Sequence, residues 1–368
     1  MLNDFVVCAT RSMKKYAAKV VSQLAKFPSL ADQVETFDGV DLLNIDHFAN
    51  GEMEVTVDSS IRGKDAFVFT SSARNDADIG VDESKIELYH AIDVLKRSQA
   101  AKITVFEPFM SCSRSDRTTR RNSVGLWIHI KTLVSLGTNH IVTYQLHSDK
   151  SQSMVDPALC SFDNIPAHTL LERYLCDVSI RSPEKLEKEV SPNWAFCSVD
   201  AGGEKLARIF ANAFNSPLVI AHKQRDQSRL NTVESINILS AEPVTDKTLW
   251  IVDDMIDTAG SVQSLIHALA NLCPKEINII AVHALFSPPA VERIQTFLSQ
   301  GLIKRIIVTD TVNCPVTMAE QIPNLEIVPS TGLSARVINT IATNSSMNKL
   351  MRPFDAGIYL KSPNLFNQ

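Results

Sequence analysis

The sequence predicts an α/β fold built from two similar-sized domains, each a mostly parallel sheet flanked by helices. Short apolar runs rich in Val, Ile and Phe recur along the chain with helix-like segments between them, which is the pattern of buried strands in a parallel sheet. The chain has 368 residues, which is more than one hydrophobic core usually serves, since domains of about 150 residues are typical.

The strand-like runs are spread over the whole chain. They comprise residues 5–10, 66–72, 102–108, 140–146, 194–200, 217–222, 249–254, 277–286, 303–310 and 325–330. Residues 84–98 place their apolar side chains near helical spacing, which predicts a helix that covers a sheet. Residues 124–136 are apolar nearly all round, which predicts a buried helix.

The boundary between the two domains is expected near residue 162. Residues 151–167 are the least regular stretch, with two prolines and little periodicity, which is typical of a linker. We therefore expect an N-terminal domain over 1–162 and a C-terminal domain over 163–344. After residue 344 the chain is polar and contains prolines, so residues 345–368 are expected to form a C-terminal extension.

Composition excludes several classes of protein. No apolar run approaches the roughly 18 residues that cross a bilayer, and the first residues do not have the pattern of an export signal. The seven cysteines are far apart without a C-x-x-C pair, as expected of reduced thiols in a cytoplasmic protein. A net charge of −5 with no long basic run argues against nucleic acid as a partner.

The strongest chemical signal lies in residues 249–262, where an apolar strand ends in acids and continues through small residues into a helix-like segment. The turn from a strand into a helix offers backbone N–H groups and the positive end of a helix dipole, which suit a phosphate group. Thr258 and Ser261 add hydroxyl donors, and Gly260 allows close approach. Asp253 and Asp254 suit sugar hydroxyls or a metal ion instead.

This segment resembles the phosphoribosyl pyrophosphate binding loop of the type I phosphoribosyltransferase fold. The half of the chain before it resembles the amino-terminal half of phosphoribosyl pyrophosphate synthetases, and the resemblance runs in order from about residue 40 to residue 335. The resemblance implies two tandem domains of this fold, with ATP on the N-terminal side and ribose 5-phosphate on the C-terminal side.

Two segments of the first half carry the expected ATP site. Residues 48–52 resemble the Phe-x-Asp-Gly-Glu segment that binds adenine in the family, with Phe48, Asn50 and Glu52 at its key positions. Asn50 replaces an aspartate, which removes a charge but keeps an acceptor oxygen. Arg114 and Asp116 match the Arg-Gln-Asp segment near the ATP phosphates, where a guanidinium pairs with two oxygens at once.

Four further residues match metal and catalytic positions of the family. His147 matches the histidine of its Asp-Leu-His metal and ATP site, and Asp200 matches the aspartate of Ser-Pro-Asp-x-Gly-Gly, the second metal contact. Lys223 and Arg225 match the Lys-x-Arg pair of its mobile catalytic loop. The resemblance implies that Lys223, Arg225 and His147 act in catalysis.

The implied reaction is the transfer of the β,γ-diphosphoryl group of Mg-ATP to the C1 hydroxyl of ribose 5-phosphate, with Mg²⁺ as cofactor. The residues implied to bind ribose 5-phosphate are Asp253, Asp254, Asp257, Thr258, Ala259, Gly260 and Ser261. The family also implies a homo-oligomer. Departures at Asn50, Gln145 and residues 151–155 leave open a catalytically silent, partner-regulating subunit, and the loop alone would also suit a phosphoribosyltransferase.

Overall fold

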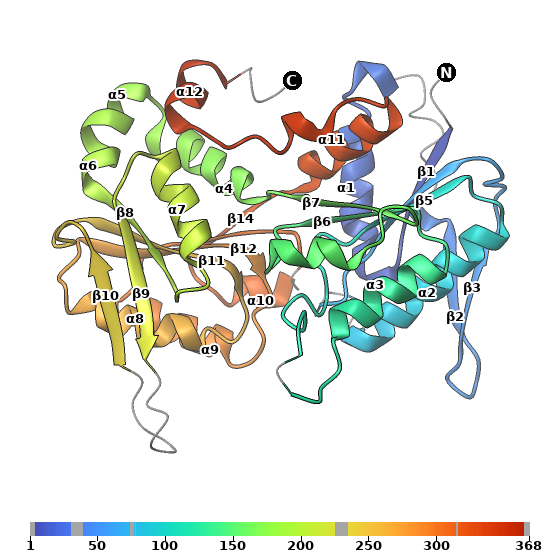
Figure 1. The fold of residues 1–368 in the computed structure, drawn as a ribbon, viewed down its shortest axis with the longest axis horizontal. Coiled ribbons are helices and arrows are strands. Elements are labelled where there is room, and N and C mark those ends of the chain that lie inside the picture. Colours follow the sequence, from blue (N-terminus) through green and yellow to red (C-terminus); the bar gives the residue numbers. More distant parts are fainter. Residues whose placement is uncertain are drawn as a thin grey trace. The chain divides into compact units, whose positions relative to one another are not determined.

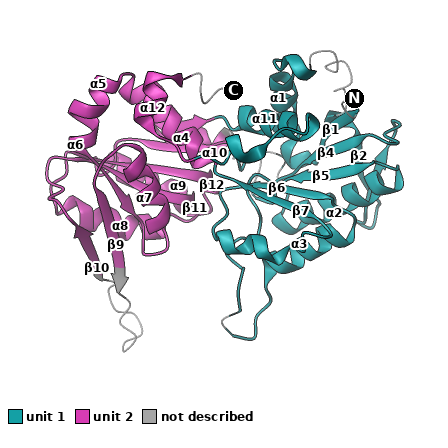
Figure 2. Ribbon diagram, turned by 45° about the horizontal axis from the view of Figure 1, so that its top comes forward, with its two compact units in different colours: residues 1–166, 311–315, 329–352 teal, residues 167–310, 316–328, 353–368 magenta. Residues whose placement is uncertain are grey.

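The computed structural model describes residues 4–30, 40–73, 77, 79–118, 120–224, 235–313 and 316–363. The chain divides into two compact units (Figure 2). Unit 1 comprises residues 1–166, 311–315 and 329–352, and unit 2 comprises residues 167–310, 316–328 and 353–368. Each unit contains a mostly parallel sheet with helices on both faces, so the α/β class predicted from the sequence is confirmed (Figure 1).

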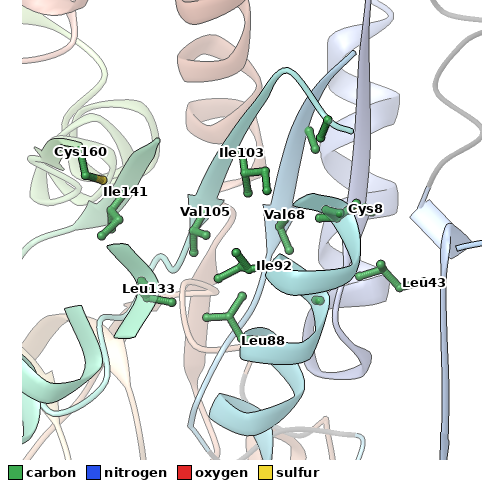
Figure 3. Close-up of a cluster of buried hydrophobic side chains, with 14 of the residues drawn as sticks. Cys8, Leu43, Val68, Leu88, Ile92, Ile103, Val105, Leu133, Ile141 and Cys160 are labelled. Atoms are coloured by element: carbon green, nitrogen blue, oxygen red, sulfur yellow. The ribbon is translucent and has the colours of Figure 1, made fainter. Parts of the chain in front are cut away.

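Unit 1 is built on a five-stranded parallel sheet of order β1-β4-β5-β6-β7. Its strands are β1 (Phe5–Ala9), β4 (Asp65–Phe69), β5 (Lys102–Phe106), β6 (His140–Tyr144) and β7 (Ser161–Ile165). Helices α1 (Lys14–Leu24) and α11 (Thr331–Ala342) lie on one face, and α2 (Val81–Arg97) and α3 (Gly125–Ser135) lie on the other (Figure 1). The core on the second side joins Leu88 and Ile92 of α2 to Ile103 and Val105 of β5 (Figure 3).

Helix α3 is not the buried helix that its composition predicts. Leu126, His129, Ile130 and Leu133 are buried, but Trp127 and Ile128 are 46% and 48% exposed. The helix covers only one face of the sheet, so a single stripe of side chains can enter the core. On the outer side, the Trp127 ring is partly covered by Lys131, whose ammonium nitrogen lies 4.5 Å from the centre of the ring.

A separate antiparallel hairpin lies between β1 and β4 in sequence. It consists of β2 (Leu43–His47) and β3 (Met53–Val57), which the sequence pattern did not predict. Leu43 and Val55 are buried while Asn44 and Asp46 are exposed, so only one face of the hairpin packs. β3 packs against α2, and the turn of the hairpin extends away from the sheet (Figure 1).

Unit 2 is built on a seven-stranded sheet of order β10-β9-β8-β11-β12-β13-β14, in which only the β9–β10 pair is antiparallel. The strands are β8 (Trp194–Ser198), β9 (Leu218–Gln224), β10 (Ser235–Ser240), β11 (Thr248–Ile256), β12 (Glu276–Ala284), β13 (Ile306–Thr309) and β14 (Leu325–Val328). Helices α4 (His168–Tyr174) and α7 (Glu204–Ala213) cover one face, and α8 (Gly260–Ala270) and α9 (Ala290–Ser299) cover the other (Figure 1).

Shorter helical segments complete the two units. They are η1 (Arg11–Met13), η3 (Asp149–Met154), η4 (Leu175–Ile180), α5 (Pro183–Lys185), η5 (Leu186–Val190), α6 (Ser191–Asn193), α10 (Val316–Glu320), η6 (Met347–Lys349) and α12 (Ala356–Lys361). In the part of the chain that the structure describes, no helix combines the length and the apolar character needed to span a bilayer. The six cysteines among the described residues form no disulfide, and Cys314 lies outside them.

The chain crosses between the units more often than the sequence suggested. It enters unit 2 after residue 166, returns to unit 1 for 311–315 and 329–352, and ends in unit 2. α11 therefore belongs to unit 1, where it packs on α1, rather than to the C-terminal domain expected over 163–344. Nor is the tail a mere extension: the Tyr359 hydroxyl donates to Asp177 Oδ1 at 3.0 Å, and Phe354 is buried.

Glu172 of α4 is a buried acid whose carboxyl oxygens have no hydrogen-bonding partner among the described residues. Burial raises its pKa well above the usual value. The unfolded chain ionises Glu172 from about pH 4 upward, whereas the folded chain keeps the proton to higher pH. Glu172 therefore does not lower the free energy of unfolding at low pH, but it lowers it progressively as the pH rises towards the folded pKa.

We expect Glu172→Gln to raise the free energy of unfolding at pH 8 by about 1 to 3 kcal/mol, and to change it little at pH 4, where both side chains are neutral. Denaturant unfolding of both proteins at the two pH values measures this difference. Glu187→Gln is the matched control, because Glu187 lies exposed in η5 of the same unit. An equal gain at both pH values would contradict a neutral, buried Glu172.

Candidate functional site

Asp253 and Asp254 lie on β11 itself, near its carboxyl end. The apolar run 249–252 forms the buried centre of the strand, and both aspartates are half-buried. Val252 lies opposite Ser198 of β8, and Asp253 lies opposite Ala281 of β12. Since the carboxyl ends of parallel strands share one edge of the sheet, the two acids lie where such sheets bind ligands.

Asp200 lies at the same edge, two residues after β8. Its Oδ1 accepts the backbone N–H groups of Gly202 and Gly203, at 2.8 and 3.1 Å, just before α7 begins. Burial raises the pKa of Asp253 well above its usual value, and the charges of Asp254 and Asp200 raise it further. The three carboxyl groups therefore form a cluster of negative charge that a cation would stabilise.

Residues 257–261 form the turn from β11 into α8. Ala259 has φ = 57°, in the left-handed region, and precedes the first helical residue, Gly260. Thr258 and Ser261 are exposed, and the first N–H groups of α8 have no partner within the helix. The positive end of the helix dipole adds to the attraction for an anion.

Arg293 of α9 is a neighbour of this turn that sequence reasoning missed. Its Nη1 donates to the carbonyl oxygen of Thr258 at 2.8 Å. A Cβ atom added at Gly260 would lie 3.2 Å from the same nitrogen. Because Arg293 is distant in sequence and has no motif around it, only the packing of α9 reveals its role in holding the turn.

The predicted catalytic pair, Lys223 and Arg225, lies at the end of β9. The backbone of Lys223 is paired with Ile236 of β10, so the two strands form an antiparallel arm at one edge of the sheet. Arg225 lies outside the described residues, as does the side chain of Lys223. Their catalytic roles therefore stay predictions.

In unit 1, Phe48, Asn50 and Glu52 come together on the turn of the β2–β3 hairpin. The N–H of Phe48 donates to the carbonyl of Glu52 at 2.8 Å, and the N–H of Glu52 donates to Asn50 Oδ1 at 3.1 Å. Gly51 has φ = 89°, which a residue with a side chain adopts only with strain. The turn therefore holds Phe48, which is 53% exposed, at an outer end of the unit.

Arg114 and Asp116 lie on the loop between β5 and α3, and His147 lies three residues after β6. Arg114 and His147 are exposed, and Asp116 is half-buried. β5 and β6 are adjacent and parallel, so both loops leave the same edge of the unit 1 sheet. Gln145, which follows β6 directly, adopts a left-handed backbone conformation with φ = 46°.

Among the described residues, no group of three or more His, Cys, Asp or Glu side chains is arranged to hold a metal ion by itself. His147 belongs to unit 1 and Asp200 to unit 2, and each is described within its own unit. The acidic cluster of unit 2 nevertheless has the oxygen donors that Mg²⁺ prefers. Magnesium commonly uses one or two carboxylates together with substrate phosphates and waters, and this donor set fits that mode.

Comparison with known proteins gives consistent matches along the chain. Residues 6–137 match the family model described as the N-terminal domain of ribose phosphate pyrophosphokinase, and residues 185–297 match the phosphoribosyl transferase domain. The ribose-phosphate pyrophosphokinase of Mycoplasma pneumoniae is 32% identical over 310 residues, covering 84% of this chain and 87% of that protein. The chloroplastic ribose-phosphate pyrophosphokinase 1 of Arabidopsis thaliana is 31% identical, covering 88% and 74%.

A solved structure is similar over nearly the whole chain. The phosphoribosylpyrophosphate synthetase from Mycobacterium smegmatis superposes with a TM-score of 0.74 at 26% identity, covering 93% of this chain and all of that one. The two proteins therefore share one fold.

Proposed function

Because the chain belongs to the ribose-phosphate pyrophosphokinase family, we propose that it transfers the β,γ-diphosphoryl group of Mg-ATP to the C1 hydroxyl of ribose 5-phosphate. The products are phosphoribosyl pyrophosphate and AMP. The observation that carries this proposal is the junction of β11 and α8, where an acidic strand end meets a helix start made of small residues.

We assign ribose 5-phosphate to this junction. Thr258, Gly260 and Ser261 surround the 5-phosphate, with the N–H groups at the start of α8 as donors, and Asp257 and Ala259 complete the turn. Asp253 and Asp254 offer carboxylate oxygens that accept hydrogen bonds from the ribose hydroxyls. Arg293 fixes the turn through Thr258.

We assign ATP to the residues of unit 1. Phe48 offers a ring for stacking on adenine, while Asn50 and Glu52 offer polar contacts to the base. Arg114, Asp116 and His147 then serve the phosphate side of the nucleotide. Because Phe48 is exposed in the turn between β2 and β3, we further propose that it completes the site of a second copy in a homo-oligomer.

The reaction requires positioning and charge stabilisation more than covalent chemistry. His147 and Asp200 are the proposed protein ligands of Mg²⁺, which, when bound with ATP, would neutralise charge on the diphosphate oxygens. Lys223 and Arg225 stabilise the negative charge that develops as AMP leaves. Oδ1 of Asp200 accepts from the N–H groups of Gly202 and Gly203, so its other carboxyl oxygen is the proposed metal contact.

The test is the formation of AMP and phosphoribosyl pyrophosphate from ATP, Mg²⁺ and ribose 5-phosphate, with and without inorganic phosphate. Equimolar formation of both products supports the proposal. A folded protein that binds ribose 5-phosphate without turnover would contradict it and would favour a silent, partner-regulating subunit. Transfer of the ribosyl group from phosphoribosyl pyrophosphate to a base would instead identify a phosphoribosyltransferase.

A further inference from the structure

The loop that carries Arg114 and Asp116 is anchored by a buried network that neither its motif nor the proposed reaction explains. The loop leaves β5 at Glu107, whose side chain is completely buried. Glu107 Oε1 accepts the backbone N–H of Ser111 at 3.2 Å. The acid therefore holds the segment that leads into Arg114 from its inner side.

The other oxygen of Glu107 extends the network into the helices. Glu107 Oε2 lies 2.7 Å from Nε2 of His129 on α3, and Nδ1 of His129 lies 2.9 Å from the hydroxyl of Tyr89 on α2. His129 is 1% exposed. One continuous line of hydrogen bonds thus connects α2, α3 and the loop within unit 1.

The donors and acceptors of this line match when His129 donates from Nε2 and accepts at Nδ1. Glu107 then accepts two hydrogen bonds, and Tyr89 donates to Nδ1. Burial raises the pKa of Tyr89, and the charge of Glu107 raises it further, so the hydroxyl keeps the proton that it donates. Every polar atom of the network then has a partner in a site of low dielectric constant, which makes the network rigid.

A second set of contacts holds the next part of the loop. Lys85 of α2 donates to Cys112 Sγ at 3.3 Å. The N–H of Gly125, at the start of α3, donates to Ser115 Oγ at 3.0 Å, and a Cβ atom at Gly125 would lie 3.2 Å from Cys112. Residues on both sides of Arg114 are therefore tied to α2 or α3.

We propose that Glu107 and His129 are positioning residues for ATP: they act through the backbone of residues 111–115 on the placement of Arg114. This inference rests on the proposed function, because the role of Arg114 at the ATP phosphates is part of that function. The side chains themselves are buried beneath the loop and do not contact the nucleotide. Their loss is therefore expected to weaken ATP binding and leave ribose 5-phosphate binding unchanged.

The test compares equilibrium dissociation constants, measured calorimetrically on the full chain, for ATP with Mg²⁺ and separately for ribose 5-phosphate. Glu107→Ala leaves buried donors without an acceptor, and we expect the ATP constant to rise about 10-fold and the ribose 5-phosphate constant to stay within about 2-fold. Glu107→Gln keeps an acceptor for Ser111 and is expected to restore most of the affinity. If Glu107→Ala fails to fold, His129→Phe carries the same expectation.

The matched control is His140→Phe. His140 also pairs with a carboxylate, because its Nε2 lies 2.9 Å from Asp163 Oδ2, but it lies at the amino end of β6, the opposite edge of the sheet from the loop. The control is expected to keep the wild-type ATP constant. An unchanged ATP constant in Glu107→Ala, or equal losses for both ligands, would overturn the inference.

The outcome separates this inference from the proposed reaction. If the wild-type protein binds ATP without turnover and Glu107→Ala binds ATP more weakly, the proposed reaction is contradicted and the positioning role is supported. Wild-type protein that does not bind ATP would overturn both.

Discussion

Replacing Lys223 with alanine is expected to lower the turnover number about 100- to 1,000-fold, which is the usual effect of removing one donor that stabilises transition-state charge. Its backbone lies at the end of β9, where the antiparallel arm with β10 leads into residues 225–234. A cation there would neutralise the oxygens of the departing AMP. The measurement is AMP formation at saturating ATP and ribose 5-phosphate.

The proposed role of Lys223 makes the expected loss specific to turnover. Dissociation constants for both substrates are expected to change less than the rate, because the interaction strengthens only as the bond to AMP breaks. Lys188→Ala is the matched control, since Lys188 is exposed and pairs with Glu184. Activity of Lys223→Ala equal to that of this control would contradict the proposed catalytic role of Lys223.

Asp253→Asn is expected to weaken ribose 5-phosphate binding roughly 10- to 100-fold while it stabilises the fold. The loss follows because hydrogen bonds to a charged carboxylate are the stronger kind. The gain in stability follows because burial and the nearby charges of Asp254 and Asp200 disfavour the ionised form of Asp253. Calorimetry with ribose 5-phosphate and thermal unfolding measure the two effects on one protein.

The gain in stability of Asp253→Asn is expected to depend on pH. The folded pKa of Asp253 is raised above its unfolded value of about 4, so wild-type stability from this group is present at low pH and falls as the pH rises. The variant lacks this decline, and its advantage of about 1 to 3 kcal/mol at pH 8 should disappear near pH 4. Asp246→Asn, an exposed change in the same unit, controls for the loss of one charge. A variant that loses both affinity and stability would contradict this account.

The central strands could be predicted from sequence because burial on both faces leaves continuous apolar runs. β4, β5, β11 and β12 all follow this rule. The four missed strands, β2, β3, β7 and β10, are all partly exposed. In β2 and β7 polar residues such as Asn44 and Asp163 interrupt the pattern, and only pairing with a neighbour stabilises the extended backbone.

The candidate site could be predicted where its residues are contiguous. Residues 253–261 form one continuous segment from the end of β11 through the turn into α8, so their chemistry is visible in the amino-acid sequence. Arg293, Glu107 and His129 could not be found in this way, because each acts through a contact made only after helices pack. His129 also lies in an apolar helix, where a histidine gives no signal of the acid that it meets.

The repeated crossing of the chain between units has a consequence for synthesis on the ribosome. The sheet of unit 1 is complete once residue 165 has emerged, but α11, which covers α1, consists of residues 331–342. Until then Tyr16 lacks Ser330 and Ser334, whose hydroxyls lie 2.7 and 2.8 Å from its own. The nascent first half therefore lacks its covering helix until residues 331–342 have emerged, so unit 1 is completed only after most of unit 2 has been synthesised.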